Sequence, residues 1–188
     1  QQSKPQSDKV KKQTVDTISE RGVPIQFNLF PEGGDLISGL STRMAFKAVD
    51  PQGRPVDVEG VLFEDNDTLL RFKSSHAGMG SFDFLPNKSK KYHIQLISPE
   101  SDSIWALPEI RSSGIQLHLA RRDSSNLYFT VRKFPGMETK VIYLRGSLRG
   151  NECFLESGKL KDQLEFEIPL NNFNQQGIAE FTLLDEHN

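Results

Sequence analysis

Apolar and polar residues alternate along most of the chain from residue 25 onward, as in strands that bury one face. In the stretch P-I-Q-F-N-L-F, the apolar residues Ile25, Phe27 and Leu29 fall on one face, and the polar residues between them fall on the other. The alternation recurs in both halves of the chain, at 43–48, 82–84, 92–96, 115–119, 127–131, 164–168 and 179–183. The chain is therefore predicted to consist mainly of half-buried strands.

Two further runs, 61–63 and 141–144, are apolar on both faces and indicate central strands. Turn signals separate the runs: D-P-Q-G at 50–53 has proline second and glycine fourth, as a type I turn prefers. Short strands separated by such turns are typical of antiparallel sandwiches. No long helical pattern follows residue 22, so parallel α/β folds, which need crossover helices, are excluded.

The length of 188 residues accommodates two sandwiches of about 90 residues each. The chain is therefore predicted to be all-β, with two tandem seven-stranded antiparallel β-sandwiches of fibronectin III or immunoglobulin-like type. The boundary is expected within 98–112, where S-P-E-S-D-S interrupts the alternation, which gives sandwiches over 23–102 and 103–188. Residues 1–22 are polar and lack periodicity, and are interpreted as a tail or linker, with a short helix at 8–18 as an alternative.

The composition excludes several classes of partner. The chain is 36% hydrophobic and 26% charged, with a net charge of -2, so it has no strong field to attract nucleic acid or an anionic membrane. No apolar run approaches the ~20 residues that cross a bilayer, and no secretory signal is present. We therefore expect no nucleic-acid partner and no direct membrane insertion of this stretch. Cys153 is the single cysteine and forms no disulfide within the chain.

The histidines do not form a metal-binding pattern. His76, His93, His118 and His187 each lie more than four residues from one another and from Cys153, so no local zinc spacing exists. His93 and His118 fall on the polar phase of their strands and are predicted to lie on the surface. Cys153 lies in a predicted strand and is expected to be a small buried hydrophobe.

The segment H-A-G-M-G at 76–80 is predicted to be a structural turn, with a ligand-binding or catalytic His76 as the alternative. Gly78 and Gly80 allow backbone angles or close approaches that other residues avoid. Met79 is expected to plug the end of the core.

Several common catalytic and cofactor motifs are missing from the sequence. It contains no G-x-S-x-G elbow, no phosphate-binding G-K-[ST] loop and no G-x-G-x-x-G fingerprint. The acidic residues at 65–67 lack the spacing of an EF-hand calcium loop. No catalytic residue, cofactor or metal site is predicted, and the chain is not expected to be an enzyme. Trp105, with Phe134 and Tyr128, is a speculative sugar-stacking platform, against the alternative that these aromatic residues pack in the core.

A compact motif follows the first strand: Phe30, Pro31, Glu32, Gly33 and Gly34. Proline cannot donate to a sheet ladder, so Pro31 should end the strand or lie at an edge. The two glycines should supply positive φ angles. Glu32 is then expected to anchor the turn, either by accepting backbone N–H bonds or by pairing with Arg43, rather than to catalyse a reaction.

Four stretches of the first half occur in a specific order: F-P-E-G-G-D-L-I-S-G-L at 30–40, M-A-F-K-A-V-D-P-Q-G-R-P-V-D-V-E-G-V at 44–61, H-A-G-M-G-S-F-D-F-L-P at 76–86 and K-Y-H-I-Q-L at 91–96. This order resembles the macroglobulin-like (MG) domains of bacterial alpha-2-macroglobulin-related envelope proteins. Such domains are abundant in Bacteroidetes, where some accompany a TonB-receptor plug domain. The second half is similar to a following MG domain in four stretches: G-I-Q-L-H-L at 114–119, Y-L-R-G-S-L-R-G at 143–150, F-E-I-P-L at 166–170 and G-I-A-E-F-T-L-L-D at 177–185.

The resemblance implies MG-type, fibronectin-like sandwiches that act as a non-catalytic structural or protein–protein interaction module of a larger envelope protein. It implies a periplasmic, outer-membrane or cell-surface location, with other domains of the same polypeptide or other envelope proteins as partners. It also implies that the last sandwich lacks an edge strand here. Cys153 is followed by F-L-E and not by the G-E-Q of the thioester motif, so protease-trapping chemistry does not carry over.

Three other functions remain open from the sequence. The main alternative is a carbohydrate- or ligand-binding module at the cell surface that uses Trp105. A hydrolase or protease-inhibitor unit is a second alternative. An adhesin-like role, in which a sheet edge accepts a donated strand, is a third.

Overall fold

The computed structural model describes residues 24–186, and this part of the chain is all-β with one short 3-10 helix, η1 (Leu170–Asn172). The predicted tail at 1–22, the helix considered at 8–18 and His187 lie outside the described residues. The strands are β1 (Gln26–Pro31), β2 (Leu36–Ile37), β3 (Thr42–Val49), β4 (Glu59–Glu64), β5 (Asp67–Lys73), β6 (Met79–Phe84), β7 (Tyr92–Ser98), β8 (Glu100–Ala106), β9 (Ile110–Arg111), β10 (Ile115–Arg122), β11 (Asn126–Lys133), β12 (Lys140–Leu148), β13 (Asn151–Leu160), β14 (Gln163–Pro169) and β15 (Ala179–Asp185).

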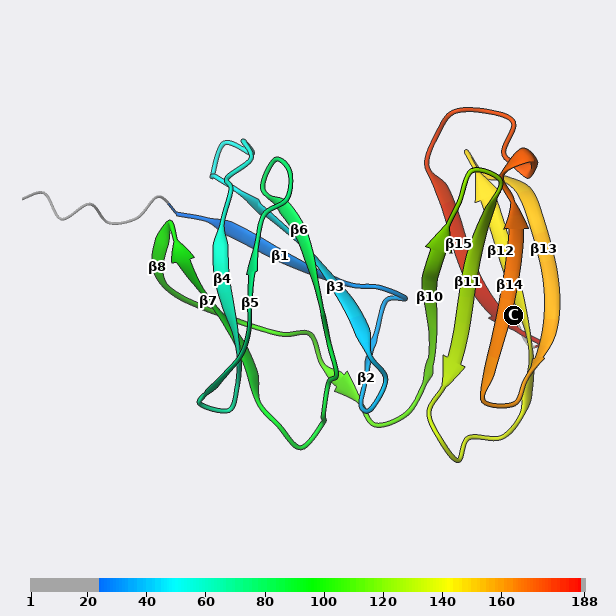
Figure 1. The fold of residues 1–188 in the computed structure, drawn as a ribbon, viewed down its shortest axis with the longest axis horizontal. Coiled ribbons are helices and arrows are strands. Elements are labelled where there is room, and N and C mark those ends of the chain that lie inside the picture. Colours follow the sequence, from blue (N-terminus) through cyan, green and yellow to red (C-terminus); the bar gives the residue numbers. More distant parts are fainter. Residues whose placement is uncertain (1–23, 187–188) are drawn as a thin grey trace, which may run out of the picture.

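The strands gather into two lobes that lie side by side along the long axis of the molecule (Figure 1). In the first lobe, residues 24–111, a sheet of order β1-β3-β6 lies with a sheet of order β5-β4-β7-β8. In the second lobe, residues 114–186, the sheets have the orders β10-β11-β14 and β13-β12-β15. All pairings within these four sheets are antiparallel. The prediction of an all-β fold built from antiparallel sheets is confirmed.

Each lobe has its own hydrophobic core, and the alternation in the sequence decides which side chains enter it. In β3, Met44 and Phe46 are at most 2% exposed while Arg43 and Lys47 point to solvent. The first core is rich in aromatic rings, with Phe72 placed 4.9 Å from the rings of both Phe46 and Phe82. The second core centres on Val131, Ile142, Leu144, Leu160 and Ile168. The runs that are apolar on both faces form β4 and β12, each central in its sheet as predicted.

The lobe boundary lies later in the chain than the sequence suggests. β8 spans the predicted boundary at 102/103 and pairs with β7, so residues up to 111 belong with the first lobe. The interruption S-P-E-S-D-S at 98–103 is not a linker: it holds the last residue of β7, the turn residue Pro99 and the first four residues of β8. A hairpin turn and an interdomain linker use the same polar residues, so the alternation pattern alone does not separate them.

The turn predicted at 50–53 is present, and a buried carboxylate holds it. The Gly53 N–H donates to the Asp50 carbonyl oxygen at 2.9 Å, and the Asp50 carboxylate accepts the backbone N–H groups of Gln52 and Arg54. Arg54 Nε lies 2.6 Å from Asp50 Oδ2. Burial alone would raise the pKa of Asp50. The hydrogen bonds from Arg54 and Gln52 outweigh burial and lower this pKa below its ordinary value of 3.8.

Asp50→Asn is expected to destabilise the protein at neutral pH and to matter less in acid. A carboxyl whose pKa is lower in the folded chain contributes stability above its unfolded-state pKa of about 3.9. That contribution is lost as the pH falls through the folded-state pKa. The difference in melting temperature between the native protein and D50N should therefore shrink from about pH 6 to about pH 2. A difference that stays constant over this range would contradict the role given to Asp50.

Candidate functional site at the junction of the lobes

The motif after β1 forms a tight turn whose tip points toward the second lobe (Figure 1). Pro31 is the last residue of β1, as predicted, and the Gly34 N–H closes the turn on the Pro31 carbonyl oxygen at 3.0 Å. Gly33 and Gly34 both have positive φ, 81° and 90°, which confirms their predicted backbone role. We call residues 30–34 the FPEGG turn.

The Glu32 carboxylate crosses from this turn to β10. Its Oε1 accepts the backbone N–H of Leu119 at 2.8 Å, and its Oε2 lies 2.7 Å from His118 Nδ1. The prediction that Glu32 accepts a backbone N–H is confirmed, although the donor belongs to the other lobe. The predicted pairing with Arg43 is wrong, because Arg43 Nε instead lies 3.3 Å from Asp83.

The prediction that His118 lies on the surface is wrong. Its side chain is 22% exposed and contacts Glu32. Gln116, two residues earlier on the same polar face of β10, is 2% exposed, and its Nε2 donates to Thr42 Oγ1 at 2.6 Å. The polar face of β10 is covered because the first lobe packs against it. A single sequence does not reveal a neighbouring lobe, so the alternation alone predicts solvent there.

Gly33 allows the turn to approach the β10 backbone closely. A Cβ built on Gly33 would lie 2.8 Å from the Leu117 carbonyl oxygen and 3.2 Å from the Leu117 nitrogen. The same Cβ on Gly34 would meet nothing within 4 Å. Gly33 is therefore required twice, for its positive φ and for contact with the second lobe, whereas Gly34 is required for its φ alone.

A second connection lies beside the FPEGG turn, where the chain passes from one lobe to the next. β2 and β9 form a short parallel pair, and the Ser38 N–H extends it to the Arg111 carbonyl oxygen at 2.9 Å. Arg111 also forms an ion pair with Asp35 at 3.1 Å. The buried Ile37 side chain packs so closely on Gly114 that a Cβ there would lie 2.8 Å from it. The segment between the lobes is therefore fixed against the first lobe.

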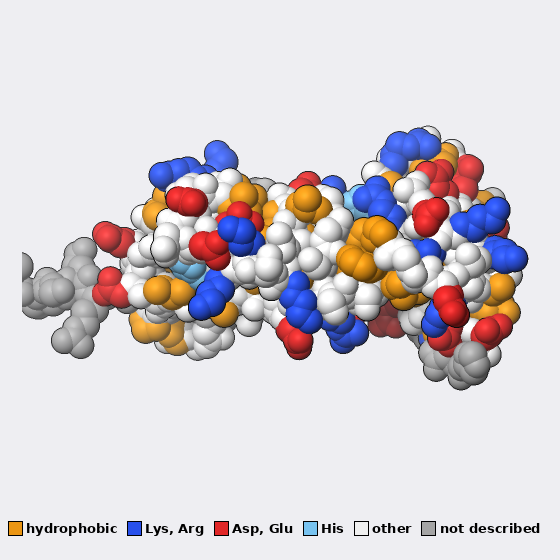
Figure 2. Space-filling view, turned by 90° about the horizontal axis from the view of Figure 1, so that it is seen from below, with side chains coloured by type: hydrophobic (Ala, Val, Ile, Leu, Met, Phe, Trp, Pro, Cys, Tyr) orange, Lys and Arg blue, Asp and Glu red, His pale blue; other side chains and the backbone are white. Residues whose placement is uncertain are grey.

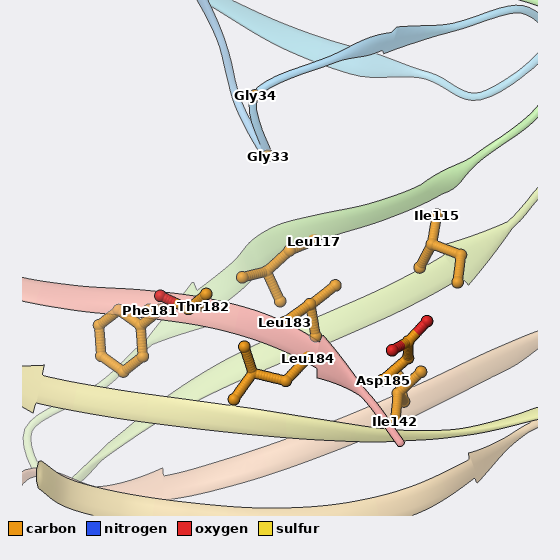
Figure 3. Close-up of a pocket in the computed structure, with 10 residues that line it drawn as sticks. All are labelled: Gly33, Gly34, Ile115, Leu117, Ile142, Phe181, Thr182, Leu183, Leu184 and Asp185. Carbon is orange, nitrogen blue, oxygen red and sulfur yellow. The ribbon is translucent and has the colours of Figure 1, made fainter. Parts of the chain in front are cut away.

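An open groove adjoins the FPEGG turn on the second lobe (Figure 3). Its cavity volume is about 890 Å³, and β10 and β15 form its two sides. Figure 3 shows Gly33 and Gly34 above Leu117, with Leu183 facing Leu117 from β15. Most lining side chains are apolar, and Asp185 is the one titratable side chain among the described lining residues. Apolar side chains thus line the groove together with polar atoms of the strands and of Asp185.

The H-A-G-M-G segment is a tight turn, as predicted. His76 and Met79 exchange backbone hydrogen bonds of 2.8 and 3.2 Å, and Gly78 has a φ of 72° and donates to Asp57 Oδ1 at 2.9 Å. His76 is exposed at this turn. Met79 does not plug the core, because it is 43% exposed. The neighbouring Gly80 instead faces the core, where the ring of the buried Phe46 fills the space beside it.

Gly80→Ala is expected to lower the free energy of unfolding by about 2 kcal/mol through overpacking. The added Cβ would lie 2.5 Å from the Phe46 ring and 2.8 Å from the Lys73 carbonyl oxygen, so ring and backbone must both shift. Chemical denaturation measures the loss. Gly53→Ala, at a φ of 79° where a Cβ meets nothing within 4 Å, reports backbone strain without overpacking, whereas Gly80 has no positive φ and reports overpacking alone. An unchanged stability for G80A would contradict this packing.

Trp105 does not form the speculated sugar-stacking platform with Tyr128, and Cys153 is not the buried residue that the sequence predicts. Trp105 is half-buried and packs edge-on against Phe27 in the first core, with ring centroids 5.6 Å apart. Tyr128 lies in the second lobe, where the Arg121 guanidinium stacks 3.5 Å from its ring centre. Trp105 and Tyr128, two of the three aromatic residues of the speculated platform, therefore lie in different lobes. Cys153 is half-exposed in β13 and not buried, since that strand lies at the edge of its sheet.

The described residues contain no cluster of three or more histidine, cysteine or acidic side chains arranged to hold a metal ion. Within residues 24–186 no helix has the length and apolar character needed to span a membrane. The candidate site of the described residues is therefore the junction of the lobes, with the Glu32 contacts and the adjoining groove.

Comparison with known proteins does not assign the chain to a family. No protein-family model matches it, and a search of curated proteins gives no match.

Proposed function

We propose that the chain is a non-catalytic structural and contact module in which two tandem β-sandwiches of the MG type are held in one relative orientation. The strand orders support the finer fold assignment. The first lobe has three and four strands in its two main sheets, which is the seven-strand complement of a fibronectin-like sandwich, and the second lobe has three and three. The module would act as a rigid spacer in a larger bacterial envelope protein, as the motif order implies.

The observation that supports this proposal most directly is the pair of hydrogen bonds from Glu32 of the FPEGG turn to His118 and Leu119 of β10. A carboxylate that accepts a backbone N–H and contacts an imidazole is held by charge-assisted hydrogen bonds, which are stronger than neutral ones. Glu32 makes both contacts across the junction at 2.7 and 2.8 Å. Two lobes joined by a flexible linker would be expected to move independently. These two Glu32 contacts, which we call the Glu32 clamp, and the β2–β9 pair together favour a fixed arrangement of the two lobes.

The Glu32–His118 pair is interpreted as structural and not catalytic. In nucleophilic catalysis a carboxylate orients a histidine that in turn bonds a serine, cysteine or threonine. Within the described chain His118 has no hydrogen bond to such a side chain. One carboxylate oxygen of Glu32 also accepts the backbone N–H of Leu119, a contact that positions the turn and has no role in a reaction of this type.

The envelope location and partners rest on the motif resemblance. The partners would be neighbouring domains of the same polypeptide or other envelope proteins, and the site would be periplasmic, outer-membrane associated or at the cell surface. Figure 2 shows cationic and anionic side chains interspersed on one face of the molecule, which agrees with the net charge of -2 and favours protein over nucleic acid as a partner.

Distance measurement between spin labels tests the rigid-spacer proposal. One label is attached to the half-exposed Cys153 of the second lobe, and the other to Lys73→Cys, an exposed position of the first lobe. The proposal predicts a single narrow distance distribution for the native junction and a broader one after Glu32→Ala. A broad distribution in the protein with the native junction would overturn the proposal.

A further inference from the structure

The outer face of the β10-β11-β14 sheet gathers polar side chains at one place. These three strands lie side by side in the second lobe, with β11 in the middle (Figure 1). Their register places Tyr128 of β11 opposite Glu167 of β14, and Thr130 opposite Glu165. The core residue Phe129 lies between Tyr128 and Thr130 and points inward. The two carboxylates and the two hydroxyl-bearing side chains therefore share the face that points away from the core.

A β-bulge in β10 turns a cationic side chain toward the same face. Leu119 pairs with Phe129 and Arg121 pairs with Tyr128, so Ala120 is an extra residue between them. Strict alternation would direct Arg121 to the core side, like Leu119. The bulge moves it to the outer face, where its guanidinium lies 3.5 Å from the centre of the Tyr128 ring. Bulges re-aim side chains in this way and are common next to functional sites.

A pocket of about 420 Å³ lies over these strands and is separate from the groove at the junction. Its volume falls within the range of about 300–1,000 Å³ that small-molecule sites occupy. The lining side chains that can form hydrogen bonds with a ligand are Arg121, Tyr128, Thr130, Glu165 and Glu167.

Several of these groups have unused hydrogen-bonding capacity. Thr130 is only 4% exposed, and its hydroxyl takes part in no hydrogen bond among the described residues. Buried hydroxyl groups normally have a partner, so an unpartnered one in the wall of a pocket points to a ligand. Glu165 and Glu167 accept hydrogen bonds of 2.7 to 3.2 Å from neutral side chains, and neither forms an ion pair with a described residue.

The balance of charge in the pocket is negative. Arg121 Nη1 lies 3.0 Å from Asp123 Oδ2, and this carboxylate offsets the charge of the guanidinium. Arg132 and His118 lie on the same face of the sheet by register, but neither lines the pocket. The charges of the two glutamates thus lack a cationic partner, and a ligand that supplies one would complement them.

We propose that this pocket binds the guanidinium group of an arginine side chain from a partner polypeptide. A guanidinium is flat, has five N–H donors and no acceptor, and matches carboxylates in bidentate geometry. Glu165 and Glu167 are two positions apart on β14, about 7 Å along the strand, so one flat group with donors on opposite edges can contact both. The Thr130 hydroxyl can accept a further N–H. A lysine ammonium concentrates its charge at one point, and a neutral sugar offers no charge to the two carboxylates.

The inference rests on the proposed role as a contact module and names the chemistry of one contact. NMR titration of the whole chain tests it, with backbone amide shifts as the readout. The probe is N-acetyl-arginine N-methylamide. The matched control is the same derivative of citrulline, in which a neutral urea group of nearly the same shape replaces the guanidinium. The corresponding lysine derivative and glucose test the two other ligand chemistries.

The inference predicts saturable shifts at residues 120–121, 128–130 and 165–167, and binding of the citrulline derivative that is weaker by about tenfold or more. The lysine derivative should also bind more weakly than the arginine derivative. The double variant Glu165→Gln, Glu167→Gln should lose the shifts. Glu152→Gln, which removes an exposed carboxylate of β13 outside the pocket, should keep them.

Four results would overturn the inference: no saturable shifts, equal binding of the citrulline or lysine derivative, equal binding of glucose, or native binding in the double variant. The pocket is formed by residues of the second lobe alone. Each of these results can therefore occur while the distance distribution between the lobes stays narrow, which distinguishes them from failure of the rigid-spacer proposal.

Discussion

Replacing Gly33 with alanine is expected to lower the free energy of unfolding by about 3 kcal/mol. An alanine at a φ of 81° incurs the left-handed penalty of about 1–2 kcal/mol. Its Cβ would also lie 2.8 Å from the Leu117 carbonyl oxygen, a backbone atom that moves only if β10 shifts away from the first lobe. The loss is measured by chemical denaturation, with the inter-lobe distance measured in the same variant.

Gly34→Ala is the matched control for this prediction. Gly34 has a similar φ of 90°, but an added Cβ meets nothing within 4 Å, so its loss should reflect backbone strain alone. The inter-lobe distance should change in G33A and stay unchanged in G34A. Equal stability losses and equal distances in the two variants would contradict a contact of Gly33 with the second lobe.

Glu32→Ala is expected to cost about 3 kcal/mol, since it removes two hydrogen bonds to a charged group and leaves their partners at the junction unpaired. Glu32→Gln should cost less, about 1–2 kcal/mol, because the amide oxygen still accepts the Leu119 N–H while the charge is lost. Thermal and chemical denaturation report both losses. In Glu32→Ala the two lobes should also begin to unfold separately.

A double-mutant cycle with His118→Ala assigns the effect to the contact. If Glu32 and His118 act on each other, the double variant should lose less stability than the sum of the two single variants. Glu152→Gln, which removes an exposed carboxylate on β13, is the control for the loss of charge alone. Additive losses of stability in the cycle would contradict a contact between Glu32 and His118. A stability loss in Glu152→Gln as large as in Glu32→Gln would contradict a specific role of Glu32 at the junction.

Much of the fold is predictable from the sequence because period-2 alternation directly reports which side chains face a core. Phe27, Met44, Phe82, Ile94 and Phe166 were all on the predicted inward phase, and all are buried. Alternation does not predict burial correctly where a side chain is covered by a part of the molecule outside its own sandwich. The predicted boundary cut through β8, because a polar hairpin turn resembles a linker in sequence.

The candidate site was predictable in part. The sequence singles out the FPEGG turn and the conformational role of its glycines, because proline and paired glycines have few other uses at the end of a strand. It gives no signal for His118 or Gln116, which sit on a polar phase that predicts solvent. Their burial arises from the packing of one lobe on the other, which is a tertiary property without a local pattern. Met79 and Cys153 were misplaced for a related reason, since turn and edge positions leave side chains more exposed than an apolar residue suggests.

The sequence motif and the open groove concern different aspects of function. The FPEGG turn is proposed to hold the two lobes as one unit, while the groove between β10 and β15 is an open surface of the second lobe beside that turn. The turn also lines one end of the groove, through Gly33 and Gly34. A variant that loosens the turn should therefore change the shape of the groove as well as the alignment of the lobes.

Residual dipolar couplings of the backbone amides test most directly the claim that the FPEGG turn fixes the lobes. In a weakly aligned sample, couplings from residues 24–111 and 114–186 should fit one alignment tensor together with the structure, and in Glu32→Ala they should require two. If the native protein already requires two tensors of different magnitude, the lobes move independently and the FPEGG turn does not hold them in one orientation.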